Sequence, residues 1–220
     1  MTLLQAVALG IIQGLTEFLP VSSSGHLVLF QHLFGMHQPE LIFDVAVHVG
    51  TLAAVCIYFY SDLAAMISQV GLWVLGKRRP GKAGAAVPEI RLAAMIAAGS
   101  VPTAIIGVAL HGIADILFSS LLLVGFALAA TGFWMWFTRR RDNSGKGIAG
   151  LSTVRAVLIG VAQGVAVIPG ISRSGATIAA SLYLGLDRET AARYSFLLSI
   201  PAIAGAALLN LVDAPAAGSA

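Results

Sequence analysis

Residues Gly10–His26 read GIIQGLTEFLPVSSSGH, and residues Gly160–Ala176 read GVAQGVAVIPGISRSGA. An offset of 150 residues without a gap superposes identical residues of the two stretches: Gly10 on Gly160, Gln13 on Gln163, Gly14 on Gly164, Ser22 on Ser172, Ser24 on Ser174 and Gly25 on Gly175. The chain therefore contains an internal repeat. Each copy is an apolar stretch that breaks at a loop with proline, glycine and hydroxyl side chains, which predicts two short helices joined by a polar elbow.

The composition favours a membrane protein. Hydrophobic residues make up 58% of the 220 residues and charged residues only 10%, which is too little charge for the surface of a soluble domain. Apolar segments that approach the length of a bilayer crossing are Phe43–Tyr60, Leu92–Leu110, Phe118–Phe137 and Tyr194–Val212. We therefore expect an all-α integral membrane protein, a polytopic helical bundle.

The net charge of +3 does not indicate a nucleic-acid partner, because the basic residues flank apolar spans and form no separate basic face. They lie in two clusters, first Lys77, Arg78, Arg79 and Lys82, then Arg139, Arg140, Arg141 and Lys146. Two spans, joined by a loop without Lys or Arg, separate the two basic clusters. Because the chain crosses the membrane twice between them, both clusters lie on the same face, and the positive-inside rule makes this face cytoplasmic. The single cysteine, Cys56, excludes a disulfide framework within the chain.

The arms of the first repeat, Met1–Leu19 and His26–Gly35, are each short for a full crossing, which predicts a re-entrant hairpin. One crossing separates this hairpin from the first basic cluster, so the hairpin enters the membrane from the outer face. The second repeat starts directly after the second basic cluster, so its hairpin enters from the inner face. We thus predict two inverted-topology repeats in a single transmembrane domain, 1–220. Repeat one covers about 1–76, the paired spans 92–138 and repeat two about 151–212. Such hairpins meet near the bilayer midplane, where they can hold a charged ligand.

Only two charged residues lie inside the repeated stretches, Glu17 and Arg173. Ionisable groups at membrane depth cost at least about 2.5 kcal/mol each and usually serve function. The alternative is a structural salt bridge between the two residues across the elbows. We favour a functional role for both.

The first elbow combines a carboxylate, hydroxyls and an imidazole. Gln13 and Glu17 are four residues apart on one helix face and together could hold a cation or a water. Ser22, Ser23 and His26 follow the break at Pro20, and with Glu17 they supply a nucleophile, a base and an orienting acid for group transfer. The serines could instead serve only to cap the next helix.

The second elbow has the composition of a phosphate cradle. Arg173 offers a planar fork of donors, Ser172, Ser174 and Thr177 add hydroxyls, and the helix that follows presents free N–H groups. Outside the elbows, His48 with Asp44 one turn earlier could be a helix–helix contact or a distant support for the site, and we favour the structural contact.

These stretches resemble a known family. QGLTEFLPVSSSGH at 13–26, FDVAVHVGTLAAV at 43–55 and PGISRSGATI at 169–178 are similar to the signature stretches of bacterial undecaprenyl-diphosphate phosphatases of the bacitracin-resistance type. The resemblance covers the chain to about Val212. Family members normally continue for one or two further spans, so the resemblance and the repeat symmetry both predict spans beyond residue 220.

The resemblance implies a multi-pass enzyme of the bacterial inner membrane that removes the terminal phosphate of undecaprenyl diphosphate. The product is the monophosphate carrier used in cell-wall synthesis. It also implies a divalent cation, Mg or Ca, near Glu17 and Gln13, and a site that opens towards the outer face. The nucleophile is left open between His26, Ser23 activated by His26, and a metal-bound water. Arg173, the elbow serines and Thr177 would bind phosphate.

Two further functions compete with this assignment. A lipid-phosphate flippase or anion transporter can be built on the same inverted hairpins, but it needs only the phosphate cradle and no nucleophile. A structural scaffold needs neither. The expected partners are the polyprenyl diphosphate substrate and membrane lipids, and the small residues at 202–207 permit close packing either within the chain or in a homodimer.

Overall fold

The computed structural model describes residues 1–36, 40–77, 88–139 and 145–213, and every named element in these ranges is a helix, as the sequence predicts. The α-helices are α1 (Leu3–Thr16), α2 (Ser23–Leu33), α3 (Leu41–Tyr58), α4 (Tyr60–Val74), α5 (Pro88–His111), α6 (Ala114–Ser119), α7 (Leu121–Thr138), α8 (Thr153–Val165), α9 (Arg173–Tyr183) and α10 (Arg188–Asp213), with a short 3-10 turn at Ile148–Gly150. The basic residues Arg78, Arg79, Lys82, Arg140 and Arg141 lie outside the described ranges.

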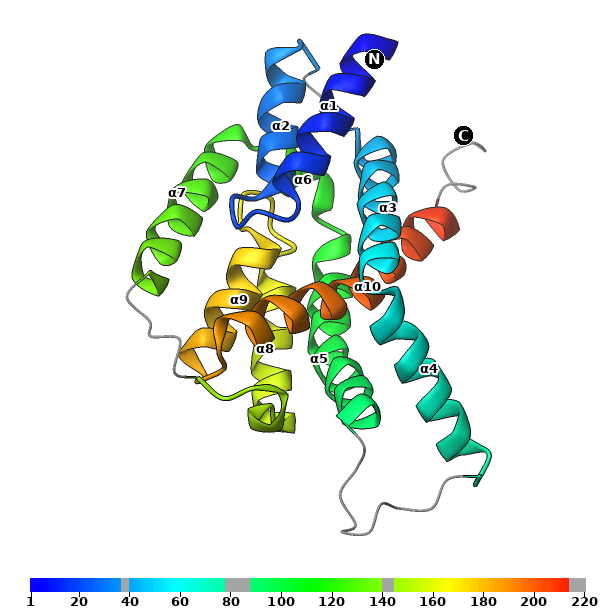
Figure 1. Cartoon of the computed structure of the whole chain (residues 1–220). Helices are drawn as coiled ribbons and strands as arrows, with labels where there is room; N and C mark the ends of the chain where they lie inside the picture. Colours follow the sequence, from blue (N-terminus) through cyan, green and yellow to red (C-terminus); the bar gives the residue numbers. More distant parts are fainter. Residues whose placement is uncertain (37–39, 78–87, 140–144, 214–220) are drawn as a thin grey trace.

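The repeated stretches fold as two helix–loop–helix pairs, α1–α2 and α8–α9. The second helix of each pair begins at an equivalent serine, because the hydroxyls of Ser22 and Ser172 accept the N–H groups of Gly25 and Gly175 at 3.3 and 3.1 Å. Figure 1 shows α1–α2 in the upper part of the molecule and α8–α9 in the lower part, with their elbows side by side. The capping hydrogen bonds are therefore equivalent at both breaks, although the backbone differs, with a φ of +64° at Ser22 and −70° at Ser172.

Three described helices are long and apolar enough to cross a membrane: Pro88–His111, Leu121–Thr138 and Arg188–Asn210. These correspond to the last three of the four predicted spans. Their lipid-facing surfaces carry large exposed side chains, such as Ile105 and Phe126, as do the outer faces of α1 and α3. Exposed apolar area on this scale is typical of a protein solvated by lipid.

The remaining predicted span, Phe43–Tyr60, corresponds to α3, and the chain bends at the end of this helix. Helices α3 and α4 meet at Phe59 with an angle of 76°. No Pro or Gly lies at the break, and the cause is tertiary packing instead. The Phe59 ring lies against Phe196 of α10 with 6.2 Å between centroids, and Arg193 Nε of α10 donates to Asp62 Oδ2 of α4 at 3.0 Å.

The span predicted to begin at Phe118 begins three residues later. Ser120 separates α6 from α7, and its hydroxyl accepts the N–H of Leu123 at 3.4 Å, so it caps α7. The short helix α6 precedes this cap. The predicted loop between the paired spans is therefore longer and partly helical.

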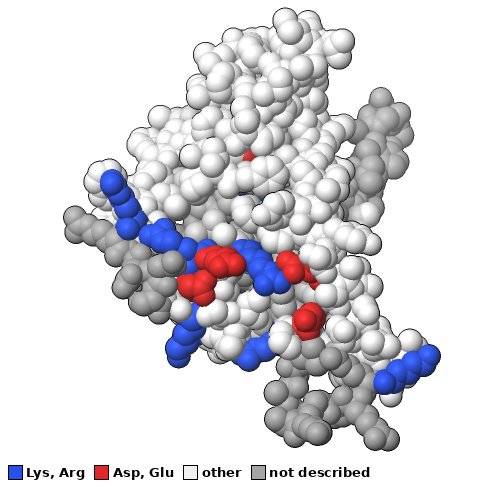
Figure 2. All heavy atoms as spheres, viewed as in Figure 1, with Lys and Arg blue, Asp and Glu red and all other residues white. Residues whose placement is uncertain are grey.

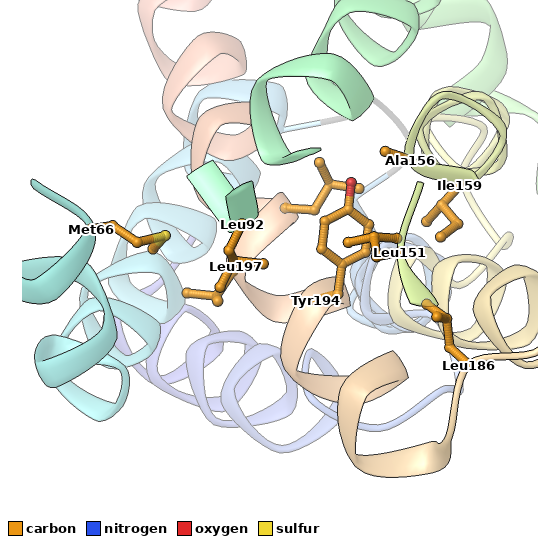
Figure 3. Close-up of a cluster of buried hydrophobic side chains, with 9 residues drawn as sticks. Met66, Leu92, Leu151, Ala156, Ile159, Leu186, Tyr194 and Leu197 are labelled. Atoms are coloured by element: carbon orange, nitrogen blue, oxygen red, sulfur yellow. The ribbon is translucent and has the colours of Figure 1, made fainter. Parts of the chain in front are cut away.

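The central core lies where α4, α5, α8 and α10 meet. Figure 3 shows Tyr194 of α10 among Met66, Leu92, Leu151, Ala156, Ile159, Leu186 and Leu197. The Tyr194 hydroxyl donates to the carbonyl of Met95 at 2.8 Å, which satisfies its one polar group. This core fixes the second repeat against the paired spans.

Helices α5 and α8 cross at a pair of glycines. A Cβ on Gly160 would overlap the carbonyl of Gly99, and a Cβ on Gly99 would lie 2.9 Å from the carbonyl of Ala156. Thr103 Oγ1 donates to the Gly160 carbonyl at 2.8 Å across the same crossing. Close approach through small residues and an interhelical hydrogen bond is a common way to pack helices in lipid.

The charged side chains mark one part of the surface. Figure 2 shows Lys, Arg, Asp and Glu gathered across the lower half of this face, whereas the upper half, over α1 and α2, is nearly uncharged. The sequence agrees, because Glu17 is the only charged residue among residues 1–36. Charged groups avoid the hydrocarbon layer and collect at its boundary.

The glycine crossing yields a stability prediction. Gly160→Ala should destabilise the chain by about 1–3 kcal/mol, the usual cost of overpacking, because the new methyl group meets backbone. The matched control is Gly10→Ala at the equivalent position of the first repeat, where a Cβ meets nothing within 4 Å. Thermal unfolding in detergent, followed by tryptophan fluorescence, should show a lower midpoint for Gly160→Ala and an equal or higher one for Gly10→Ala. Equal midpoints for both variants would contradict this packing.

Candidate functional site

The two elbows meet through the Glu17 carboxylate. Glu17 is 6% exposed, and both of its oxygens are occupied. Arg173 donates to Oε1 as an ion pair, while Gln13 Nε2 donates to Oε2 at 2.8 Å. The Ser23 hydroxyl also donates to Oε2 through a short hydrogen bond. Burial of a carboxylate is tolerated here because an opposite charge and two further donors surround it.

The Glu17–Arg173 ion pair is the contact that the structural alternative predicted. It does not by itself decide between a structural and a functional role. Ser23 and Arg173 occupy equivalent positions of the two repeats, and both contact Glu17. The first repeat thus contributes a hydroxyl hydrogen-bonded to a carboxylate, and the second contributes a cation to the same group.

The second elbow is held from outside by α7. Thr131 Oγ1 donates to the Gly170 carbonyl at 2.9 Å and accepts the N–H of Ser172 at 3.1 Å. Gly170 has a φ of +94°, and a Cβ there would lie 2.6 Å from the Val124 carbonyl. The position therefore needs glycine for both its backbone conformation and its packing. Across the elbows, Ser174 Oγ donates to the Leu19 carbonyl at 3.1 Å.

A cavity of about 620 Å³ opens beside this junction. Its polar end contains Glu17, Ser22, Ser23, Ser24, Ser172, Arg173 and Ser174. Its other walls are mostly apolar and come from α5, α6 and α10, including Val108, Phe118 and Leu208. A cavity that joins a cluster of polar groups to an apolar region suits an amphipathic ligand with a charged head.

Three predicted site residues, Gln13, His26 and Thr177, are not among those that line this cavity, and Gln13 reaches it only through its hydrogen bond to Glu17. His26 Nδ1 lies 2.7 Å from the Ser22 carbonyl. Thr177 is fully buried, and its hydroxyl lies 2.5 Å from that of Ser195 and donates to the Arg173 carbonyl at 2.8 Å. The geometry gives His26 and Thr177 local supporting contacts and does not place their side chains in the cavity wall with those of Ser23 and Arg173.

His48 lies where the sequence interpretation did not place it. Its Nε2 is 3.6 Å from Glu17 Oε2, and it lines the cavity, so the interpretation as a structural helix contact missed its position. His48 Nδ1 lies 2.6 Å from the carbonyl of Asp44, one turn earlier, and Asp44 lines the same cavity. The sequence feature that could have indicated this position is the four-residue spacing of Asp44 and His48, which places an acid and a histidine on one face of an apolar helix.

Several buried polar atoms around the junction have no hydrogen-bond partner among the described residues. They include Arg173 Nη1, a donor, and three acceptors, Gln13 Oε1, Asp44 Oδ2 and Gln163 Oε1. An unpaired buried donor or acceptor costs about 1–3 kcal/mol. Such atoms at a cavity are expected to gain partners when a ligand binds.

The arrangement suits transfer of an anionic group. A hydroxyl hydrogen-bonded to a buried carboxylate can lose its proton as it attacks, and a guanidinium with a free donor can hold the anion. Within the described part of the chain, no three His, Cys, Asp or Glu side chains form a metal-binding group.

Comparisons with known proteins agree with this chemistry. The family described as bacitracin resistance protein BacA matches residues 6–219. A protein of Desulfosudis oleivorans named undecaprenyl-diphosphatase is 58% identical over 96% of this chain and 77% of its own length. Relatives with the same name from Desulforapulum autotrophicum and Methanosphaera stadtmanae are 54% and 42% identical, over 100% and 96% of this chain and 80% and 78% of their own lengths. The chain therefore belongs to the bacitracin resistance protein BacA family.

Proposed function

We propose that this chain is an integral membrane phosphatase that hydrolyses undecaprenyl diphosphate to undecaprenyl phosphate and inorganic phosphate, and so recycles the lipid carrier for cell-wall synthesis. Family membership and the name of the relatives support the substrate. The observation that carries the reaction type is the contact of Ser23 and Arg173 with one buried carboxylate, Glu17, beside a cavity.

The terminal phosphate would bind at the polar end of the cavity. Arg173 Nη1 is a buried donor without a described partner, and a phosphate oxygen would supply one. Ser22, Ser172 and Ser174 lie in the same wall, and α9 begins at Arg173, so its N-terminus adds favourable N–H groups. Thr177 would act indirectly, by fixing α9 against α10.

Ser23 is assigned as the nucleophile. Its hydroxyl proton passes to Glu17 as Oγ forms a bond to the terminal phosphorus, and the anhydride bond to the lipid phosphate breaks. The leaving group is undecaprenyl phosphate, and the enzyme holds a phosphoserine. Water then attacks that phosphorus, the Ser23 Oγ–P bond breaks, and inorganic phosphate leaves. The proton taken up by Glu17 in the first step leaves with the undecaprenyl phosphate, which restores the carboxylate. Glu17 then accepts the proton of the attacking water and passes it to the Ser23 Oγ as that oxygen leaves phosphorus. His26 supports the Ser22 carbonyl and so orients the elbow.

A divalent cation, Mg or Ca, would neutralise charge that develops on the phosphate oxygens. Gln13 Oε1 fits as a ligand because it is a buried acceptor without a described partner. Glu17 can contribute only a remaining lone pair, because donors already occupy both oxygens. The substrate phosphates would complete the coordination, as is common for magnesium.

The finer topology belongs to the same proposal. We assign α1–α2 and α8–α9 as re-entrant hairpins of inverted repeats in the cytoplasmic (inner) membrane, with the site open towards the outer face. The uncharged surface over α1 and α2 and the charged lower half support this orientation. The prenyl tail would follow the apolar walls. The small-residue stretch at 202–207 contributes Ala202, Gly205 and Ala206 to the cavity wall, and their small side chains leave room in the cavity. A homodimer that packs through this stretch stays a prediction.

A carrier built on the same hairpins is the rival function, and Glu17→Gln separates the two. Phosphate release from undecaprenyl diphosphate by the purified chain should fall by at least about 10²-fold, the usual contribution of a general base. Binding of a non-hydrolysable diphosphonate should persist, because Arg173 remains. Glu189→Gln, an exposed position in the first turn of α10, is the matched control and should release phosphate at the original rate. Phosphate release by Glu17→Gln at the original rate would refute the assigned base.

The nucleophile can be identified directly. Quenching in detergent at neutral pH, which preserves both phosphoserine and phosphohistidine, followed by peptide mass spectrometry, should find phosphate on Ser23, and Ser23→Ala should abolish both the adduct and phosphate release. Ser24→Ala is the control, because Ser24 lines the same cavity and its hydroxyl lies 3.4 Å from that of Ser22. It should lose far less activity. A phosphohistidine at His26 would show that the assignment of Ser23 is wrong.

A further inference from the structure

Asp44 is a second buried carboxylate in the wall of the cavity, and the mechanism above does not use it. It lies in the first turn of α3 and is 4% exposed. Gln31 Nε2 of α2 donates to Oδ1 at 2.6 Å, whereas Oδ2 is buried and has no hydrogen-bond partner among the described residues. A buried carboxylate oxygen in this state is costly unless a ligand completes it.

The charges around the cavity do not balance. Arg173 neutralises Glu17, but the described contacts of the Asp44 carboxylate include no cation. Its hydrogen-bond donor is a neutral amide, and the charged group that acts on it is another carboxylate, Glu40. With the histidines neutral, Glu17 and Asp44 face one cationic side chain, Arg173, in the cavity wall. An ionised Asp44, the form that binds a cation, would therefore give the cavity an excess negative charge that no described cation offsets.

A diphosphate would increase this imbalance. Its phosphates bring further negative charges into a region of low dielectric, where repulsion between like charges is several times stronger than in water. Entry becomes favourable only if a cation enters as well. The carboxylate oxygen without a donor is the natural ligand for that cation, because no existing hydrogen bond has to break.

We propose that Asp44 supplies the free carboxylate oxygen through which the cavity holds a divalent cation together with the phosphates of the substrate. The inference rests on the proposed function and goes beyond the Glu17 and Gln13 pair, whose carboxylate is already saturated by donors. One protein carboxylate plus substrate phosphates is a usual magnesium site, and it needs no cluster of three protein ligands.

Asp44 could instead serve only as a buried link between α2 and α3 through Gln31. Two variants separate these roles. Asp44→Asn keeps an acceptor for Gln31 Nε2 but removes the negative charge. Gln31→Leu removes the link and keeps the carboxylate. Asp115→Asn makes the same aspartate-to-asparagine change at an exposed position in α6, and it is the control for the loss of one negative charge from the chain.

The experiment measures binding of methylenediphosphonate to the full chain in detergent by calorimetry, with and without magnesium. Magnesium should raise the affinity of the original chain and of Asp115→Asn at least tenfold. For Asp44→Asn, the gain should fall below threefold. Without magnesium, Asp44→Asn should bind the diphosphonate as tightly as the original chain or more tightly, because a repelling charge is gone. Gln31→Leu should keep the magnesium effect even if it unfolds at a lower temperature.

An undiminished magnesium effect in Asp44→Asn would overturn the inference, as would equal losses of affinity with and without the metal, which a structural role predicts. Phosphate release by the original chain is measured in parallel. Release together with an undiminished magnesium effect in Asp44→Asn would reject the cation ligand and leave the phosphatase assignment intact. A folded original chain that neither binds the diphosphonate nor releases phosphate would reject both.

Discussion

The ion pair between Glu17 and Arg173 joins the two elbows through side chains that are 156 residues apart in the chain. Each elbow interrupts a helix inside a protein solvated largely by lipid, so its polar groups must find partners within the protein. The pair satisfies the two charges together, and Ser23 and Gln13 add donors to the same carboxylate. The polar end of the cavity, the hydrogen bond of the proposed nucleophile Ser23 and the position of Arg173 are all built around this one contact.

The repeat supplies the scaffold, and departures from the repeat supply the chemistry. Ser22 and Ser172 cap equivalent helices, and each forms an equivalent hydroxyl pair with Ser24 or Ser174, at 3.4 and 3.3 Å. At the positions that differ, Ser23 corresponds to Arg173 and Glu17 corresponds to Val167. The two elbows thus present a hydroxyl and a carboxylate, the proposed nucleophile and base, on one side and a cation on the other.

Much of this could be predicted from the sequence because the decisive signals are local. A gapless repeat, breaks at Pro20 and Gly170, and capping serines all specify helix ends within a few residues. The bend at Phe59 could not be predicted, because its cause is contact with Phe196 and a long-range ion pair. The position of His48 was missed for a similar reason. An acid and a histidine on an apolar helix indicate a shared face, but only the packing of α3 against α1 and α10 turns that face towards Glu17.

The central claim is that Glu17 and Arg173 act as one buried, mutually compensating unit. A double-mutant cycle of thermal unfolding in detergent tests it most directly, with Glu17→Gln, Arg173→Met and the double variant. Loss of one partner of a buried ion pair costs about 3–5 kcal/mol, because the other charge stays uncompensated, whereas removal of both charges costs far less. We therefore predict that the double variant unfolds at a higher temperature than at least one single variant. Additive decreases in the unfolding temperature would show that the two side chains are independent and would contradict the account.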